Sequence, residues 1–387
     1  MTDGILEKIN ALLAAISENP FYGHKLSGMT SVSSLEEFAE RVPFTTKAEL
    51  AQDQKNHPPY GTNLTCPLER YHRFHQTSGT SGQPMIWLDD REGWAWLREN
   101  WQWVWEKAGV TAGQAAIFPF SFGPFLGFWA GFESAVELGI RAIPAGGLTS
   151  ESRVALMERL RPDALCCTPT YGLHLARVAG DARSLGVKKI IVAGEPGGSL
   201  PEVRGRLEEA WGAKVIDHHG MTEVGPVTVG DPDDPRRLLV RHDSYYCELI
   251  NPNDDGVGEL VLTTLGRYGS PLLRYRTGDL VKPDGDFALH GGILGRVDDM
   301  VVVRGVNLYP GAIEEVVRAV PGVTEYEVHI DERGPMIEVR VLAEGEDLDL
   351  LERKLREVFS LRIPVKKAES GSLQRYELKA RRWKRLS

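Results

Sequence analysis

The segment from His75 to Pro84 has the composition of a phosphate-binding loop. Its core is Thr77, Ser78, Gly79, Thr80, Ser81 and Gly82. Glycines allow the backbone to close around a ligand, and hydroxyl and backbone N–H groups suit phosphate oxygens. The loop is not a Walker A motif, because no Lys-Ser or Lys-Thr pair follows the second glycine, and it is not a G-x-G-x-x-G dinucleotide-binding turn. By composition alone, an ordinary surface loop remains an alternative.

Two further glycine-rich turns follow predicted strands. The first contains Gly194, Glu195 and Pro196, and the second runs from His218 through His219, Gly220, Met221, Thr222 and Glu223. A flat ring can lie against the backbone of such turns. Adjacent residues on a strand point to opposite faces, so a metal site made by the two histidines is the weaker hypothesis.

Asp279 ends the segment Tyr275-Arg276-Thr277-Gly278-Asp279 and is a candidate for binding a sugar. A carboxylate suits a vicinal diol because its two oxygens accept two O–H donors. In isolation, a salt-bridged turn explains this segment equally well.

The elements that would position these groups alternate between strands and helices. Strands are predicted at 115–118, 140–144, 164–168, 189–193 and 214–217, and helices near 125–138, 151–160, 171–180 and 201–211. This order predicts an α/β fold with a largely parallel, helix-covered sheet. Ligands bind such sheets beyond the carboxyl ends of the strands, where the two glycine-rich turns lie.

The remainder of the chain predicts two smaller units. Short alternating strands between 226 and 265 indicate a β-subdomain. After Pro310, a helix, strands near 325–330 and 336–342, a helix over 348–359 and a strand near 363–367 indicate a small C-terminal α/β module. The basic tail from Lys379 to Arg385 is interpreted as a solvated end.

Composition narrows the classes of function. Asp and Glu total 54 against 45 Lys and Arg, and this net charge of -9 disfavours a nucleic-acid or anionic-membrane partner. The four cysteines form no C-x-x-C pair, so we expect reduced thiols and no structural zinc. Neither a signal peptide nor a bilayer-spanning run is evident, and a cytoplasmic location is expected.

These motifs together resemble those of a known family. Thr77 to Pro84 resembles the T-S-G-T-[ST]-G-x-P loop of the adenylate-forming superfamily, and Pro43 to Lys47 is similar to the P-F-T-T-K segment of phenylacetate-CoA ligases. Residues 295–310 resemble the G-R-x-D-D-M-[LIV]-x-x-R-G-V-N-[VL]-[FY]-P signature of the same ligases. The resemblance spans nearly the whole chain. It implies a large N-terminal domain (1–297) that binds ATP and the acyl substrate, and a mobile C-terminal domain (298–387).

The resemblance also implies roles for individual residues. Lys379 is the candidate catalytic lysine, with Lys384 as a fallback because Leu378 stands where the family commonly has glycine. Thr222 would meet phosphate, Glu223 would hold Mg²⁺, and Asp298 and Gly305 would be the hinge and the coenzyme A contact. The implied ATP and AMP contacts are Thr77, Ser78, Gly79, Thr80, Ser81, Gly82, Gly194, Glu195, Pro196, His219, Gly220, Met221, Thr222, Asp279 and Arg296. His219 stands where the family usually has tyrosine.

The aromatic stretch 118–129 overlies the aryl-pocket segment of the family. Phe122 and Phe125 are the candidate pocket walls, with Gly194 at the floor. Aromatic core is the commoner meaning of such a stretch. No Lys or Arg lies nearby in the sequence for a second substrate charge, so an aromatic or arylacetic monocarboxylate is the expected substrate.

The implied reaction is ATP-dependent formation of an acyl-adenylate followed by transfer of the acyl group to coenzyme A. An adenylating enzyme with another acceptor, such as a carrier protein, an amine or a cofactor hydroxyl, is the first alternative. A nucleotide-binding protein without turnover is the second, and retention of Lys379, Glu223 and Asp279 argues against it. Members of the family often pair as homodimers, and the sequence leaves the oligomeric state open.

Overall fold

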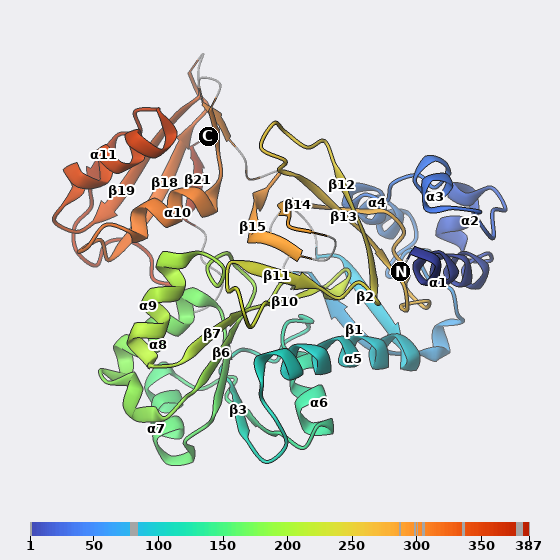
Figure 1. Cartoon of the computed structure of the whole chain (residues 1–387), viewed down its shortest axis with the longest axis horizontal. Coiled ribbons are helices and arrows are strands. Elements are labelled where there is room, and N and C mark those ends of the chain that lie inside the picture. The colour runs from blue at the N-terminus through green and yellow to red at the C-terminus, as the bar shows by residue number, and fades with distance from the viewer. Residues whose placement is uncertain are drawn as a thin grey trace.

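The structure is a computed structural model that describes residues 2–77, 84–285, 288–297, 299, 301–303, 306–334, 337–376 and 382–386. Its α-helices are α1 (Thr2–Ala15), α2 (Pro20–Leu26), α3 (Leu35–Arg41), α4 (Lys47–Asn56), α5 (Arg91–Ala108), α6 (Trp129–Glu137), α7 (Ser150–Leu160), α8 (Pro169–Ala179), α9 (Pro201–Trp211), α10 (Pro310–Arg318) and α11 (Leu348–Phe359). A large N-terminal part and a smaller C-terminal part are evident in Figure 1.

The strands fall into several sheets. They are β1 (Tyr71–Gln76), β2 (Ile86–Asp90), β3 (Ala115–Phe118), β4 (Arg141–Pro144), β5 (Ala164–Cys167), β6 (Lys189–Val192), β7 (Lys214–Asp217), β8 (Gly220–Met221), β9 (Gly225–Pro226), β10 (Thr228–Gly230), β11 (Arg237–Val240), β12 (Tyr245–Ile250), β13 (Gly258–Thr264), β14 (Tyr275–Pro283), β15 (Ala288–Arg296), β16 (Val301–Val303), β17 (Val306–Leu308), β18 (Glu325–Asp331), β19 (Glu338–Glu344), β20 (Val365–Lys367) and β21 (Trp383–Leu386).

The predicted parallel sheet is present, with strand order β4-β3-β5-β6-β7. The central strands β3 and β5 are buried throughout because helices cover both faces of the sheet. Alternate residues enter two cores: Ala116 and Cys166 pack with α5 and α6, whereas Ile117 and Cys167 pack with α7, α8 and α9. The two helical layers are visible on either side of the sheet in Figure 1. The predicted α/β class is confirmed.

A six-stranded antiparallel sheet forms the predicted β-subdomain, in the order β10-β11-β15-β14-β13-β12. The N-terminal helices pack against the connection between β13 and β14, since Leu265 and Leu273 share a core with residues of α1, α2 and α3. Helix α4 begins with a capping box in which Thr46 accepts from the Glu49 N–H and Glu49 accepts from the Thr46 N–H. This cap fixes the start of α4, where Lys47 lies.

The C-terminal part is a four-stranded sheet, β20-β19-β18-β21, packed with α10 and α11. Strand β21 corrects the prediction of a solvated basic tail: it pairs parallel with β18 and carries Trp383 to Leu386. Helix α10 contacts α9 and β15 of the N-terminal part. The exact domain boundary at 297 and 298 stays a prediction, because Asp298 lies outside the described residues. Among the described helices, none is both long and apolar enough to cross a bilayer.

Candidate active site

The base of the predicted phosphate loop is a hairpin formed by β1 and β2. The Thr77 N–H donates to Met85 O at 2.9 Å, and the Met85 N–H donates to Thr77 Oγ1 at 3.0 Å. These two bonds fix the points at which the loop leaves and rejoins the hairpin. Ser78, Gly79, Thr80, Ser81 and Gly82 lie outside the described residues, so their phosphate contacts stay predictions.

Below this hairpin, a buried ion pair supports the Thr222–Glu223 segment. The guanidinium of Arg267, which is fully buried, binds both carboxylate oxygens of Asp89 at 2.6 and 2.7 Å. The same guanidinium donates to Glu223 O at 2.6 Å and to Thr222 O at 3.3 Å. Sequence reasoning missed Arg267. Its bidentate pairing fixes the backbone from which both candidate catalytic side chains project.

Glu223 is a buried carboxylate with a cation beside it. Its residue exposure is 5%, and Lys47 Nζ lies 3.3 Å from Glu223 Oε1. Lys47 belongs to the segment Pro43 to Lys47 that distinguished the family by sequence, although no role had been predicted for it. The ammonium compensates a charge that would otherwise be costly to bury.

Asp279, 3% exposed, forms the centre of the predicted ribose site. It lies in β14 directly opposite Arg296 of β15, whose Nη1 donates to Asp279 Oδ1 at 2.8 Å. His219 Nε2 lies 3.2 Å from Asp279 Oδ2. Asp279 therefore lies on a strand rather than in a turn, and the structure brings these three predicted nucleotide contacts together.

The two adjacent histidines point to different surroundings, as expected for neighbours on extended backbone. His218 is buried against Trp101, with ring centroids 4.4 Å apart, and its Nδ1 lies 2.5 Å from Thr228 O. Burial lowers the pKa of His218 to about 4, so the ring is neutral near pH 7. Because His218 belongs to the core, a metal pair with His219 is disfavoured. Within the described ranges, no three His, Cys, Asp or Glu residues gather in a metal-binding group.

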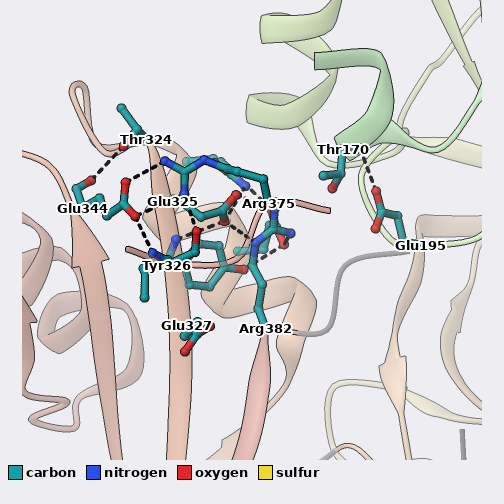
Figure 2. A network of polar contacts seen from close by, with 12 residues as sticks. Thr170, Glu195, Thr324, Glu325, Tyr326, Glu327, Glu344, Arg375 and Arg382 are labelled. Carbon is teal, nitrogen blue, oxygen red and sulfur yellow. Dashed lines mark hydrogen bonds and ion pairs between the residues drawn. The ribbon is translucent and has the colours of Figure 1, made fainter. Parts of the chain in front are cut away.

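The turn after β6 places its predicted residues at the start of α8. Gly194 adopts φ +92°, a conformation that favours glycine. Glu195 Oε1 accepts the Thr170 N–H at 2.7 Å, as Figure 2 shows. This carboxylate therefore contacts the first turn of a helix. A nucleotide contact by Glu195 or Pro196 stays a prediction.

Asp217 is a further candidate that sequence reasoning did not select. It ends β7, accepts from Ser199 Oγ at 2.6 Å and also accepts the His218 N–H at 3.0 Å. Burial raises the pKa of the Asp217 carboxyl. A signal was present in the sequence: an acidic residue at the carboxyl end of a parallel strand, directly before the histidine pair.

The two predicted pocket phenylalanines differ in environment. Phe122 packs among Phe120, Trp129 and Phe132, with ring centroids 4.4, 4.8 and 5.1 Å away. Phe125, in contrast, is 41% exposed. The backbone of this segment is tied to β1 because the Gln76 N–H donates to Pro124 O at 2.7 Å. Phe122 belongs to an aromatic wall, and Phe125 lies on an open side.

Sequence comparison supplies the family. The chain is 32% identical over 349 residues to the phenylacetate-coenzyme A ligase of Pseudomonas putida, covering 84% of this chain and 77% of that ligase. The chain belongs to the phenylacetate-coenzyme A ligase family. The relative from Thermus thermophilus is 30% identical over 366 residues, covering 87% of this chain and 80% of the relative. The predicted family is confirmed, as is the predicted enzyme class, an AMP-forming acid–coenzyme A ligase.

Solved structures distinguish between domain arrangements for this member of the phenylacetate-coenzyme A ligase family. A 2-hydroxyisobutyryl-CoA ligase in the postadenylation state, bound to R3-HIB-AMP, matches with a TM-score of 0.93 at 28% identity, covering 99% of this chain and 89% of that one. With 2-HIB-AMP and CoA in the thioesterification state, the same ligase matches over the same share of this chain with a TM-score of 0.74. The domains here are therefore arranged as in the postadenylation state.

The C-terminal domain of this ligase family member carries the predicted catalytic lysine. Residues 305–384 match the family model described as AMP-binding enzyme C-terminal domain. Lys379, Asp298 and Gly305 lie outside the described residues, so their roles stay predictions. The flanks of Lys379 are well anchored: Arg375 pairs with Glu344 at 2.6 Å and Arg382 with Glu325 at 2.7 Å (Figure 2).

Lys384, the fallback candidate, lies in β21. Its Nζ is 2.6 Å from Glu327 Oε1, on the neighbouring strand β18. An ammonium held in this way serves the C-terminal sheet. This ion pair argues against Lys384 as the lysine available for chemistry, and the role of Lys379 stays a prediction.

Proposed function

We propose that this chain activates an aromatic or arylacetic carboxylic acid with ATP and then joins the acyl group to coenzyme A. In the first step, a carboxylate oxygen attacks the α-phosphorus, the bond to the β-phosphate oxygen breaks and pyrophosphate leaves. In the second step, the thiolate sulfur attacks the acyl carbon, and the bond to the AMP oxygen breaks. Membership of the phenylacetate-coenzyme A ligase family is the observation that carries this proposal.

The described residues suit the nucleotide. The Asp279 carboxylate can accept from ribose hydroxyls while Arg296 holds its other oxygen at 2.8 Å. His219, 14% exposed at its side chain, offers a ring where the family usually has tyrosine. Thr77 to Gly82 would bind the β- and γ-phosphates, and Lys379 would stabilise the charge that develops as carboxylate and phosphate meet.

Magnesium fits the donor set around Glu223. Mg²⁺ typically binds through one or two carboxylates together with substrate phosphates. Here one buried carboxylate has a cation 3.3 Å away, and the described residues offer no larger cluster of acidic or imidazole ligands. Glu223 would hold the ion with Thr222 nearby. When bound, Mg²⁺ neutralises phosphate charge.

The aromatic wall supports the proposed class of acyl substrate. Phe120 and Phe122, between β3 and α6, form an apolar surface with Trp129, the first residue of α6. Such a wall suits a flat apolar group and offers no charge for a second carboxylate. Gly194, in the turn that follows β6 of the same sheet, is the proposed floor. The cytoplasmic location and the homodimer stay predictions.

A half-reaction assay tests the proposed function. Purified protein, ATP and Mg²⁺ are incubated with phenylacetate, benzoate, other aryl acids and 2-hydroxyisobutyrate, with and without coenzyme A, while pyrophosphate, AMP and thioester are measured. We expect pyrophosphate with an aryl acid, and thioester only when coenzyme A is present. Thioester with 2-hydroxyisobutyrate alone would overturn the proposed substrate class. Release of pyrophosphate without formation of a thioester would favour another acyl acceptor. If no acid gave pyrophosphate, the proposed enzymatic activity would be refuted.

Lys379→Ala tests the catalytic lysine within the same assay. We expect its pyrophosphate release to fall about 10²- to 10³-fold, because a cation that stabilises the transition state is lost. Lys384→Ala is the matched control, since Lys384 is held by Glu327. A larger loss in the Lys384 variant would reverse the assignment.

A further inference from the structure

Four of the nine residues that line a pocket between the two domains are arginines. Helix α8 contributes Thr170, Leu173, His174 and Arg177, and the C-terminal domain contributes Arg318, Glu325, Arg375, Tyr376 and Arg382. Figure 2 shows Arg375 and Arg382 on the side of the C-terminal domain that faces Thr170. Four guanidinium groups thus line one pocket together with a single carboxylate.

The arginines of the C-terminal domain have carboxylate partners. Arg375 pairs with Glu344 at 2.6 Å, and Arg382 with Glu325 at 2.7 Å. Arg318 Nε donates to Glu314 at 3.0 Å and lies 3.9 Å from Glu325 through Nη2. The three arginine charges are therefore balanced by three carboxylates, those of Glu314, Glu325 and Glu344.

The arginines of the N-terminal domain are not offset in this way. Within the part of the chain that the structure describes, neither Arg177 nor Arg206 of α9 forms an ion pair. Burial, followed by the nearby Arg318, lowers the pKa of Arg177, and the same two causes lower the pKa of Arg206. The carboxylate of Glu202 lies near Arg206 and partly offsets it, so the excess positive charge of the pocket rests on Arg177.

One arginine that lines this pocket also has an unsatisfied donor. Arg318 is 6% exposed, and its Nη1 is buried without a hydrogen-bond partner among the described residues. A buried donor left unpaired costs roughly 1–3 kcal/mol, so native proteins rarely keep one without a reason. Arg177, in contrast, is partly covered by neighbouring residues and partly exposed to solvent at the rim of the pocket.

We propose that this pocket binds a phosphate-class oxyanion between the two domains. Guanidinium groups present donors in a fixed fork that matches the oxygens of phosphate. Arg177 would bind from α8 and Arg318 Nη1 from the C-terminal domain, while Arg375 and Arg382 add positive charge. The Glu325 carboxylate also lines the pocket, but Arg382 already neutralises it.

Binding to both domains couples the anion to domain arrangement. A ligand that contacts two domains in one arrangement stabilises that arrangement over others. The arrangement here is the one that matches the postadenylation state. We therefore expect a bound anion to slow thioester formation and to leave adenylate formation unaffected. This expectation rests on the proposed function.

Calorimetric titration of the full chain tests the site. Inorganic phosphate and pyrophosphate are titrated separately without Mg²⁺, with chloride keeping the ionic strength constant. We expect Arg177→Gln to weaken phosphate binding about tenfold, as for loss of one charge-assisted contact, and Arg177→Lys to be intermediate. Arg159→Gln, an exposed arginine on α7, is the matched control and should bind like wild type.

The outcomes separate this site from other anion sites. No phosphate binding by the wild type, or unchanged binding by Arg177→Gln, overturns the proposal, the second result because the anion then binds elsewhere. Tight binding of pyrophosphate but not phosphate through Arg177 would identify the reaction product as the occupant. If pyrophosphate release is normal but anion binding does not depend on Arg177, the anion site is refuted and the proposed function is not. Normal anion binding without any pyrophosphate release refutes the proposed function alone.

Discussion

The ribose half and the phosphate half of the candidate site are built differently. In the ribose half, Asp279 and Arg296 face each other on paired strands, and His219 lies 3.2 Å from the same carboxylate. In the phosphate half, Thr77, Glu223 and Lys47 come from a hairpin, a turn and the start of a helix. There the Glu223 side chain has a half-exposed ammonium as its neighbour.

This difference indicates which half exists before ATP binds. A carboxylate fixed by neighbouring strands needs no rearrangement to accept ribose hydroxyls, so its orientation cost is met during folding. A buried carboxylate facing phosphates, in contrast, repels them until a metal ion arrives. We therefore expect the ribose half to set nucleotide affinity and the phosphate half to set the rate.

The largest effect is expected from Glu223→Gln. Loss of the carboxylate removes the proposed Mg²⁺ ligand, and the rate of pyrophosphate release should fall about 10²- to 10³-fold with little change in the KM for ATP. Glu158→Gln, an exposed residue of α7, serves as the control. A change confined to the KM for ATP would contradict the assignment of rate to this half.

The stability of the fold at acid pH is expected to depend on two buried histidines, one beside the phosphate half and one beside the ribose half of the candidate site. Burial lowers the pKa of both His75 and His218 to about 4 from the usual 6.5. Below pH 6.5 the unfolded chain takes up protons that the folded chain refuses, so stability falls until about pH 4. Each histidine contributes roughly 3 kcal/mol to this loss.

Denaturant unfolding at pH 7 and pH 5 measures this loss. His75→Gln and His218→Gln should each lower the difference in unfolding free energy between the two pH values, even where the substitution also lowers stability at pH 7. His72→Gln, an exposed residue of β1, should leave the difference as in wild type. An unchanged difference in both buried variants would show that other groups cause the acid sensitivity.

Asp279→Asn should act on nucleotide affinity. The amide keeps the shape but loses the charge that binds Arg296 and attracts hydroxyl donors, so the KM for ATP should rise about 10- to 100-fold. Steady-state assays with ATP and with its 2′- and 3′-deoxy forms provide the check. If Asp279 binds ribose, the variant should discriminate less between these nucleotides than wild type does. Equal discrimination would place the ribose elsewhere.

Local patterns predicted most of the fold. The strand at 115–118 was located to the residue, because an apolar run bounded by polar turns has few alternatives. Strand β21 was missed, since the segment Trp383 to Leu386 is short and half of its residues are charged. It forms because Lys384 pairs with Glu327 and the backbone pairs with β18. Propensity gives no sign of such tertiary partners.

The candidate site was only partly predicted, because local sequence patterns reveal neither tertiary partners nor contacts between distant segments. Short continuous sequence motifs contain four of the predicted residues, Asp279, Arg296, His219 and Glu223. The structure brings the first three together. Arg267 was missed because its partner Asp89 is 178 residues away in sequence, so no local spacing indicates the pair. The predicted pocket residue Phe125 proved exposed, since the aromatic stretch turns only part of its length inward.

The smallest effect, expected from Lys47→Met, tests how the two halves differ in charge. Lys47 Nζ lies 3.3 Å from Glu223 Oε1 with 44% of its side chain exposed, so the ion pair is worth about 1 kcal/mol or less. An ammonium at this position competes with Mg²⁺ for the carboxylate. Removing it should lower the Mg²⁺ concentration that half-saturates pyrophosphate release about threefold, at constant ATP.

Lys55→Met is the control, because Lys55 is exposed on the same helix. A rise in the KM for ATP at unchanged Mg²⁺ dependence would show instead that Lys47 turns to the phosphates during the reaction. The phosphate half would then contain a fixed cation of its own. Its dependence on the metal would be weaker than the contrast with the ribose half implies, and the loss expected for Glu223→Gln would shrink accordingly.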